Sequence, residues 1–155
     1  DTNTLIMVGG NDWSSAERWI EQSDTLKFLK DPANNLAFEA HVYFDKDASG
    51  TYKYSYEEEE CYPEKGIDRV KPFVEWIKQN KFHGFIGEYG IPDNDPRWNE
   101  TLDLFLGYLQ ENGINGTYWA AGPWWDTYFM AITPKDGKDR PQMPIIEKYT
   151  STLKK

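Results

Sequence analysis

The 155-residue sequence is poor in cysteine, in histidine and in positive charge. Its single cysteine, Cys61, excludes an intramolecular disulfide and a zinc site built from several cysteines. Two histidines, His41 and His83, are too few for a histidine-rich metal site, so we expect no metal and no cofactor. Acidic residues outnumber basic ones by 26 to 17, which gives a net charge of −9. This balance argues against nucleic acid and against an anionic membrane surface as partners.

Long apolar runs are also missing. No stretch approaches the ~20 apolar residues that a membrane span requires, and no basic-then-apolar leader begins the chain. Because the sequence opens at Asp1 rather than at methionine, we expect that a preceding segment was removed. No glycine-rich phosphate loop follows a predicted strand, which argues against a nucleotide-binding doubly wound fold. No repeat or linker divides the chain, so we predict one domain over residues 1–155.

Aromatic residues are abundant instead. Seven tryptophans, ten tyrosines and eight phenylalanines make up 16% of the chain. A core of this size does not need seven indoles, and a buried indole N–H requires a hydrogen-bond partner. Aromatic faces exposed in a cleft are surfaces on which sugar rings stack. The composition therefore favours carbohydrate as a ligand.

Short apolar runs alternate with amphipathic ones along the chain. The runs bounded by Gly, Asn or Asp predict strands over residues 5–8, 36–44, 82–86 and 116–119. Helical spacing predicts helices over residues 13–20, 70–77, 96–109 and 144–149. Pro72 must then lie in the first turn of its helix, or that helix begins later. Asp95 is the expected N-cap of the third helix, with Pro96 at its first position.

The resulting order is four βα units, which predicts parallel strands joined by right-handed crossovers. Four units are too few for a complete eight-fold barrel of about 250 residues. The fold is therefore either a small open α/β sheet or half of a barrel. Two long loops, 45–66 and 122–142, follow strands at their carboxyl ends, where α/β proteins bind ligands. Within the first loop we expect residues 57–60, four glutamates, to be a solvated acidic segment.

Glu88 is the leading candidate for chemistry. It follows a predicted apolar strand, so its carboxylate is expected at the ligand-binding rim, where it could act as a nucleophile or a general base. His41 and Tyr43 lie two residues apart on one predicted strand and therefore share a face. Such a pair beside a carboxylate can orient it and bind a sugar hydroxyl. Glu39 shares their parity one layer deeper, and we interpret it as structural.

Four tryptophans are candidates for binding sugar rings. Trp119 ends the fourth predicted strand, where an indole can form the floor of a sugar site. Trp124 and Trp125 follow it within the second long loop, and Trp13 follows the first strand at the same rim. Ordinary core packing is the alternative for each of them.

Several of these motifs together resemble the carboxyl-terminal half of glycoside hydrolase family 5. The resemblance rests on the segment from Gly10 to Trp13, His41-Val42-Tyr43, Gly87-Glu88-Tyr89-Gly90 and Trp119, in this order and at suitable spacing. It covers nearly the whole chain. The family comprises retaining endo-β-glucanases and relatives on a (β/α)8 barrel, so the resemblance implies half of that barrel, equivalent to strands five to eight.

Carried over by residue, the resemblance implies that Glu88 is the nucleophile and that His41 and Tyr43 are its strand-six pair. It implies that Trp119 is the sugar platform of strand eight. The family's first four strands supply an acid/base glutamate, and no equivalent is present. The only Asn-Glu dipeptide, Asn99-Glu100, falls inside a predicted helix.

Three arrangements could account for the missing acid/base glutamate. A complementary N-terminal half barrel could complete the site, or two copies of the chain could pair as a homodimer. Alternatively, the half barrel could bind carbohydrate without cutting it. We expect a secreted, retaining glycoside hydrolase of a β-linked glucan such as cellulose. The choice of preferred polymer among cellulose, mixed-linkage glucan, mannan and xyloglucan stays open. The alternatives are a carbohydrate-binding half barrel with weak or no catalysis, and a purely structural assembly fragment.

Overall fold

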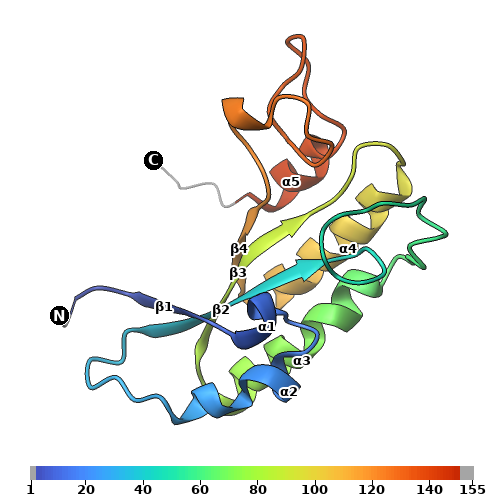
Figure 1. The fold of residues 1–155 in the computed structure, drawn as a ribbon. Coiled ribbons are helices and arrows are strands. Elements are labelled where there is room, and N and C mark those ends of the chain that lie inside the picture. The colour runs from blue at the N-terminus through green and yellow to red at the C-terminus, as the bar shows by residue number, and fades with distance from the viewer. Residues whose placement is uncertain (1–2, 151–155) are drawn as a thin grey trace.

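The computed structural model describes residues 3–150 and contains a four-stranded sheet in which every neighbouring pair is parallel. The strand order is β1-β2-β3-β4, the same as the order along the chain (Figure 1). The strands are β1 (Ile6–Gly9), β2 (Leu36–Tyr43), β3 (His83–Gly90) and β4 (Asn115–Tyr118). This confirms the predicted parallel α/β arrangement. The third strand is longer than the predicted 82–86, so Glu88 lies within it and not after it.

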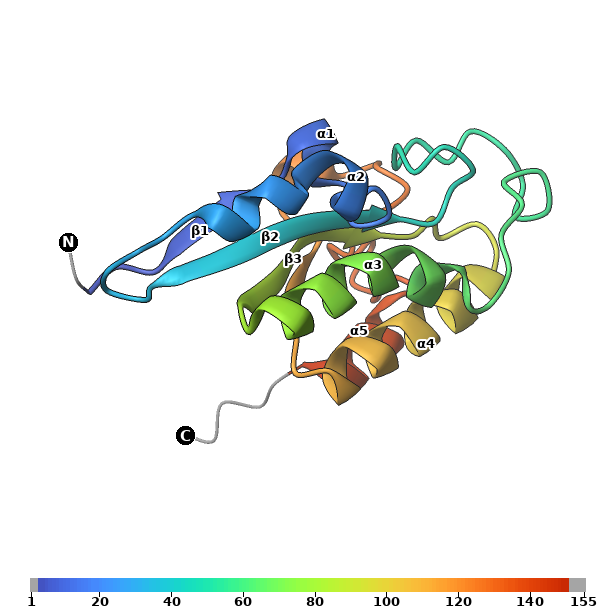
Figure 2. The same cartoon turned by 90° about the horizontal axis from the view of Figure 1, so that it is seen from below.

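The two long helices, α3 and α4, lie along one face of the sheet (Figure 2), and all the helices follow the strands in alternation. They are α1 (Asn11–Ser14), α2 (Trp19–Ser23), α3 (Lys65–Asn80), α4 (Arg97–Glu111) and α5 (Met143–Tyr149). Two 3-10 turns, Asp24–Phe28 and Pro123–Trp125, complete the regular structure of the described residues. No helix within residues 3–150 is long and apolar enough to cross a membrane.

The core lies between the sheet and its helices. In β2, Phe38, Ala40 and Val42 are buried, and the Phe38 ring lies 5.0 Å from that of Trp76 on α3. The alternate residues Glu39, His41 and Tyr43 consequently face the opposite side of the sheet. In Figure 2 that side carries none of the long helices. One strand thus supplies both the core and a row of polar side chains on the open face.

Three of the seven tryptophans belong to this core, which corrects the expectation that so small a core would not need them. Trp19, Trp76 and Trp98 are essentially inaccessible to solvent. Trp19 packs edge-on against Phe73 and Trp76, with ring centroids 4.7 and 5.4 Å apart. Large aromatic rings let a thin layer of helices bury enough apolar area against a short sheet.

The helix predicted over residues 13–20 is wrong. Asp12, Trp13 and Ser14 have φ angles of 53°, 51° and 56°, in the left-handed region, so α1 is a short left-handed turn and a right-handed helix cannot include these residues. The regular turn α2 begins only at Trp19. The helical spacing of apolar residues arose because Ala16 and Trp19 are both buried, although they lie on different local structures.

Pro72 lies in the interior of α3 and not in its first turn, because the helix begins seven residues earlier, at Lys65. The buried face of α3 contains Val70, Phe73, Val74 and Ile77, as the spacing predicts. Their burial outweighs the backbone hydrogen bond that a proline cannot donate.

Helix α4 begins one residue later than predicted, at Arg97, so that Pro96 and not Asp95 is its N-cap. Asp95 Oδ1 accepts a hydrogen bond of 2.9 Å from the backbone N–H of Arg97, the first residue of the helix. The Arg97 side chain, followed by the same backbone contact, lowers the pKa of Asp95. Asp95 therefore binds the start of the helix from the position before the N-cap.

The acidic segment 57–60 is only partly solvated. Glu59 is buried, and its carboxylate accepts hydrogen bonds from the backbone N–H groups of Lys46 (2.7 Å) and Tyr54 (2.9 Å). Its neighbours Glu57 and Glu60 form exposed ion pairs with Arg97 and Lys46. One of the four glutamates thus organises the long loop from inside.

Candidate active site

A bulge in β3 directs Glu88 onto the open face. Ala40 on β2 pairs with Ile86, but the next residue, His41, pairs with Glu88, so Gly87 is an extra residue in β3. The pairing of β3 with β4 shifts over the same residues. In a regular strand Ile86 and Glu88 would share a face, and Ile86 is buried in the core. The inserted residue lets the carboxylate turn away from that core.

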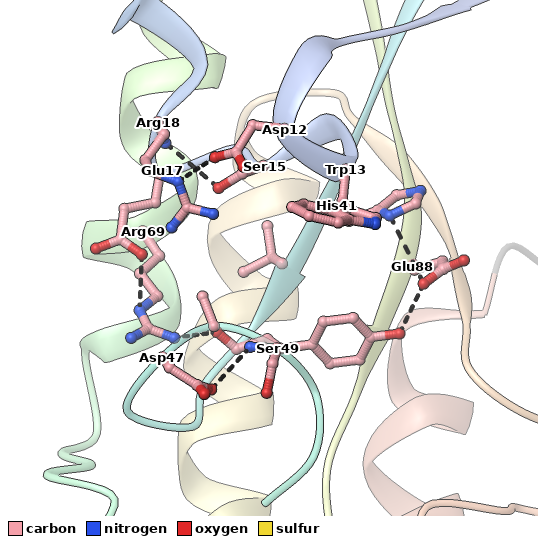
Figure 3. A pocket seen from close by; sticks show the side chains of 13 residues that line it. Asp12, Trp13, Ser15, Glu17, Arg18, His41, Asp47, Ser49, Arg69 and Glu88 are labelled. Atoms are coloured by element: carbon pink, nitrogen blue, oxygen red, sulfur yellow. Dashed lines mark hydrogen bonds and ion pairs between the residues drawn. The ribbon is translucent and has the colours of Figure 1, made fainter. Parts of the chain in front are cut away.

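Two neighbours approach the same oxygen of Glu88. The Tyr43 hydroxyl donates a hydrogen bond of 2.8 Å to Oε2, and Nδ1 of His41 lies 3.6 Å from that oxygen (Figure 3). Within the described residues, all contacts of this kind fall on Oε2. The second oxygen, Oε1, therefore stays available to a ligand in the pocket. A carboxylate held in this way can act as a nucleophile or as a base.

His41 lies between two carboxylates. Its Nε2 is 2.7 Å from Oε1 of Glu39, on the side away from Glu88. Burial alone would lower the pKa of His41, but the hydrogen bond to Glu39 and the charges of Glu39 and Glu88 raise it above the ordinary value. The imidazole consequently keeps its second proton to a higher pH than an ordinary histidine does.

Burial, followed by the hydrogen bond to Glu88 and its charge, raises the pKa of Tyr43 well above the ordinary tyrosine value. The hydroxyl therefore keeps its proton and stays a donor to Glu88 throughout the neutral and mildly alkaline range.

A pocket of about 400 Å³ opens over these side chains. Figure 3 shows Glu88, His41 and Trp13 on one side of it and a group of charged residues on the other. Trp13 is 84% exposed, because the left-handed backbone turns its indole outward into the rim. The remaining lining side chains include the ion pairs Arg18–Asp12 and Arg69–Glu17.

The other three predicted tryptophans lie outside this pocket's lining, on the segment after β4. Trp119 directly follows that strand and packs edge-on against Trp125, with ring centroids 5.0 Å apart. Tyr128 packs against Trp125 with ring centroids 5.0 Å apart, and its pKa is raised by burial and, less strongly, by the charge of Glu88. This places the Trp119 cluster within electrostatic reach of Glu88. Trp124 is 89% exposed and points away from any core contact.

A buried aspartate organises the rim, and the sequence analysis missed it. Asp45 accepts hydrogen bonds from the backbone N–H groups of Gly50 (3.1 Å) and Thr51 (3.0 Å), which folds the loop after β2 back on itself. Gly50 has a φ of +75°, and a Cβ there would lie 2.9 Å from the ring of Tyr43. The loop therefore packs directly against the tyrosine that binds Glu88.

Tyr52 and Arg69 were missed as well. The Tyr52 hydroxyl donates to the carbonyl of Gly90 (2.6 Å) and accepts from the N–H of Phe44 (2.9 Å), which joins the ends of β2 and β3. Arg69 on α3 donates to the carbonyls of Tyr43 and Lys46. The pattern Asp-x-Asp-x-Ser-Gly, which begins at Asp45, was the feature of the sequence from which a tight loop could have been predicted.

Within residues 3–150, no group of three or more His, Cys, Asp or Glu side chains is arranged to hold a metal ion. The site is thus a carboxylate flanked by an imidazole, a phenol and an exposed indole. Sugar chemistry requires a carboxylate and aromatic surfaces of this kind.

Comparisons with known proteins agree with this chemistry. The sequence profile of the family described as Cellulase (glycosyl hydrolase family 5) matches residues 1–124. The chain is 37% identical over 153 residues to a probable endo-beta-1,4-glucanase B of Aspergillus kawachii, covering 96% of this chain and 44% of that protein. It is 36% identical over 149 residues to endo-beta-1,4-glucanase B of Aspergillus niger, covering 93% and 43%.

Solved structures show the same relation. The endoglucanase Cel5A of Pseudomonas stutzeri in complex with cellobiose superposes with a TM-score of 0.87 at 45% identity, over 96% of this chain and 45% of that one. An endo-beta-1,4-glucanase of Xanthomonas axonopodis pv. citri superposes with a TM-score of 0.83 at 33% identity, over 95% and 48%. The chain thus spans about half the length of these relatives, and its four strands correspond to half of their barrel.

Proposed function

The chain belongs to the cellulase family, glycosyl hydrolase family 5, and from that premise we propose that it hydrolyses a β-1,4-linked glucan with Glu88 as the nucleophile of a retaining reaction. The relatives named endo-beta-1,4-glucanase support the substrate class. A polymeric substrate of this kind lies outside the cell, so the proposal includes secretion.

The observation that carries the proposal is the fixed carboxylate of Glu88. It stands at the carboxyl end of β3, the end at which barrel enzymes bind substrates, and it lines an open pocket. Tyr43 and His41 hold one oxygen, which leaves the other to face a bound sugar. Trp13 supplies an exposed aromatic face at the same rim.

In the proposed reaction, Glu88 attacks the anomeric carbon while the glycosidic bond breaks and an acid protonates the leaving oxygen. A glycosyl ester on Glu88 results. Water, deprotonated by the same acid/base group, then attacks the anomeric carbon and releases Glu88 and the sugar. The two steps together retain the configuration at that carbon.

The acid/base group requires a partner half barrel. The second carboxyl group must lie about 5–5.5 Å from the nucleophile. Glu39 is engaged by His41, and Glu100 is exposed on α4 among the helices of the opposite layer. We propose that the acid comes from a complementary N-terminal half barrel or from a second copy of this chain across the open edges of the sheet.

Replacing Glu88 by glutamine tests the nucleophile. Glu88→Gln keeps the shape of the side chain and its contact with Tyr43, but the amide cannot attack an anomeric carbon. We expect hydrolysis to fall by at least ~10³-fold, with glucan binding largely retained. The measurement is reducing-sugar release from soluble β-glucan, together with binding by affinity electrophoresis.

The matched control is Glu100→Gln, which changes an exposed glutamate on α4 by the same atoms. Its activity should equal that of the unmodified chain. Comparable turnover in Glu88→Gln would overturn the nucleophile assignment, and loss of activity in Glu100→Gln would identify that residue as a participant.

A second candidate function is carbohydrate binding without catalysis. The specific observation in its favour is the exposure of Trp13 and Trp124, two indoles with little solvent protection on the rim and on the loop after β4. Rigorously purified chain that binds glucan but releases no reducing sugar would support binding alone. A chain that does neither is a structural fragment.

A further inference from the structure

Glu39 is a second carboxylate on the open face. Its contact with His41 gives it more to do than occupy space. Its Oε1 contacts Nε2 of His41 at 2.7 Å. The same oxygen would lie only 1.7 Å from a Cβ built on Gly87, so the carboxylate occupies the space left by that glycine's missing side chain. The bulge residue that turns Glu88 outward therefore also makes room for Glu39.

The protons of His41 follow from its two neighbours. A carboxylate can only accept a hydrogen bond, so Glu39 requires a proton on Nε2. In a neutral imidazole Nδ1 would then be bare, with its lone pair facing Oε2 of Glu88 at 3.6 Å. Two acceptors facing one another are unfavourable, and a proton on Nδ1 removes the conflict. The geometry thus favours an imidazolium that is directed at both carboxylates.

We propose that Glu39 is a positioning residue for Glu88: acting through His41, it keeps a protonated Nδ1 directed at Oε2 and so holds the Glu88 carboxylate with Oε1 turned to the substrate. The inference rests on the proposed function, because it describes how Glu39 supports Glu88 as the nucleophile. The raised pKa of His41, in which Glu39 contributes more than Glu88, agrees with the geometry.

Other charged groups near His41 are already paired. On the segment after β1, Asp12 is bound by Arg18, and Glu17 pairs with Arg69 of α3. Asp47 lies on the loop after β2 at the far wall of the pocket. From β3 and β2, only Glu88 and Glu39 are in direct ionic contact with the imidazole among the described residues.

The test is an NMR titration of the imidazole rings in the whole chain. The sequence contains two histidines, and His83, exposed at the opposite end of β3, serves as an internal reference. We expect Glu39→Gln to shift the His41 titration midpoint to lower pH while the His83 midpoint stays in place. The amide can still accept from Nε2, so the ring stays in position but loses the charge that favours its proton.

Two further variants keep the result interpretable. Glu88→Gln should also lower the His41 midpoint, but by less than Glu39→Gln. Gly87→Ala should lower it as well, because its methyl group displaces Glu39 from the contact. A His41 midpoint that is the same in Glu39→Gln and in the unmodified chain, with native circular dichroism for both, would overturn the proposal and leave Glu39 as a packing residue.

The kinetic consequence is measured separately on soluble β-glucan. For Glu39→Gln we expect kcat to fall by about 10- to 100-fold with KM little changed, and the alkaline limb of the kcat profile to move to lower pH. An unchanged kcat profile in an active chain would overturn the proposal. Inactivity of the unmodified chain would instead bear on the proposed function and its partner half barrel, and the titration would still decide whether Glu39 governs the protonation of His41.

Discussion

Tyr43 donates to the oxygen of Glu88 that His41 also approaches, so the two residues share the task of orienting one carboxylate. Their contributions differ in kind. The hydroxyl of Tyr43 is a neutral donor whose raised pKa keeps it protonated. His41 is a charged neighbour whose contribution depends on pH.

Removing the hydroxyl isolates the first contribution. Tyr43→Phe leaves the ring packed against Gly50 but deletes the donor to Glu88. We expect kcat on soluble β-glucan to fall by about 10- to 100-fold, with a smaller change in KM. Tyr54→Phe, on an exposed ring of the neighbouring loop, is the control and should retain full activity. Equal rates for the two variants would show that Tyr43 does not orient the carboxylate.

The second contribution appears in the stability of the protein. Because the pKa of His41 is raised above its unfolded value of 6.5, the folded state binds this proton more tightly than the unfolded chain. The resulting stabilisation is complete below that value and is lost as the pH rises through the folded pKa. We expect the free energy of unfolding of the unmodified chain to fall, relative to His41→Gln, over this interval. Urea denaturation at a series of pH values measures the difference, and parallel curves for the two proteins would contradict it.

At the scale of the elements, strands were easier to predict than the local geometry that directs their side chains. Alternation in β2 correctly placed His41 and Tyr43 on one face, and the structure buries Phe38 of the same strand on the other. The bulge at Gly87 could not be predicted, because one extra residue depends on how neighbouring strands pair and leaves no periodic trace.

The prediction of a helix in the segment after β1 was wrong for a related reason. Burial of Ala16 and Trp19 imitates helical spacing, whereas the backbone at Asp12, Trp13 and Ser14 is left-handed. Such conformations in non-glycine residues cost of order 1 kcal/mol each and are maintained by surrounding contacts that a sequence does not display. Here the Ser14 hydroxyl accepts from the N–H of Gly10 at 2.9 Å. The exposed placement of Trp13 is the result.

Helix α3 offers a stability test. Pro72 interrupts its hydrogen-bonding pattern on the solvent side, so Pro72→Ala should restore one backbone bond. After allowance for the greater freedom of the unfolded chain, we expect a gain of about 1–2 kcal/mol in the free energy of unfolding. Chemical denaturation measures it. Lys71→Ala, at the neighbouring exposed position, should change stability by less than ~0.5 kcal/mol. A loss of stability in Pro72→Ala would show that the ring itself contributes packing.

At the scale of the whole molecule, the sheet has two edges that lack a strand partner within the described residues. β1 carries Ile6 and Met7, which are 46% and 42% exposed, and β4 is exposed over most of its four residues. A groove beside β4 is lined by Leu106, Leu109 and Ile146. Open parallel edges next to apolar surface are unfavourable in water.

Light-scattering mass of the purified chain, with the same peak assayed on soluble β-glucan, tests how these edges are used. We expect association, since pairing the edges removes apolar surface from water. A dimer that releases sugar would show that the acid group comes from within this sequence. An active monomer would contradict the need for a second half barrel. If the dimer forms through β1, Met7→Lys should shift the measured mass toward that of the monomer.

The agreement between strand order and chain order also has a consequence for how the protein is made. Each strand pairs only with strands that are its immediate neighbours in sequence, so most of the sheet forms through sequential docking. Once Gly90 has emerged from the ribosome, β1, β2 and β3 are all present, together with Glu39, His41, Tyr43 and Glu88. The proposed nucleophile and the side chains that contact it can thus assemble during synthesis, before β4 and its tryptophan-rich loop exist.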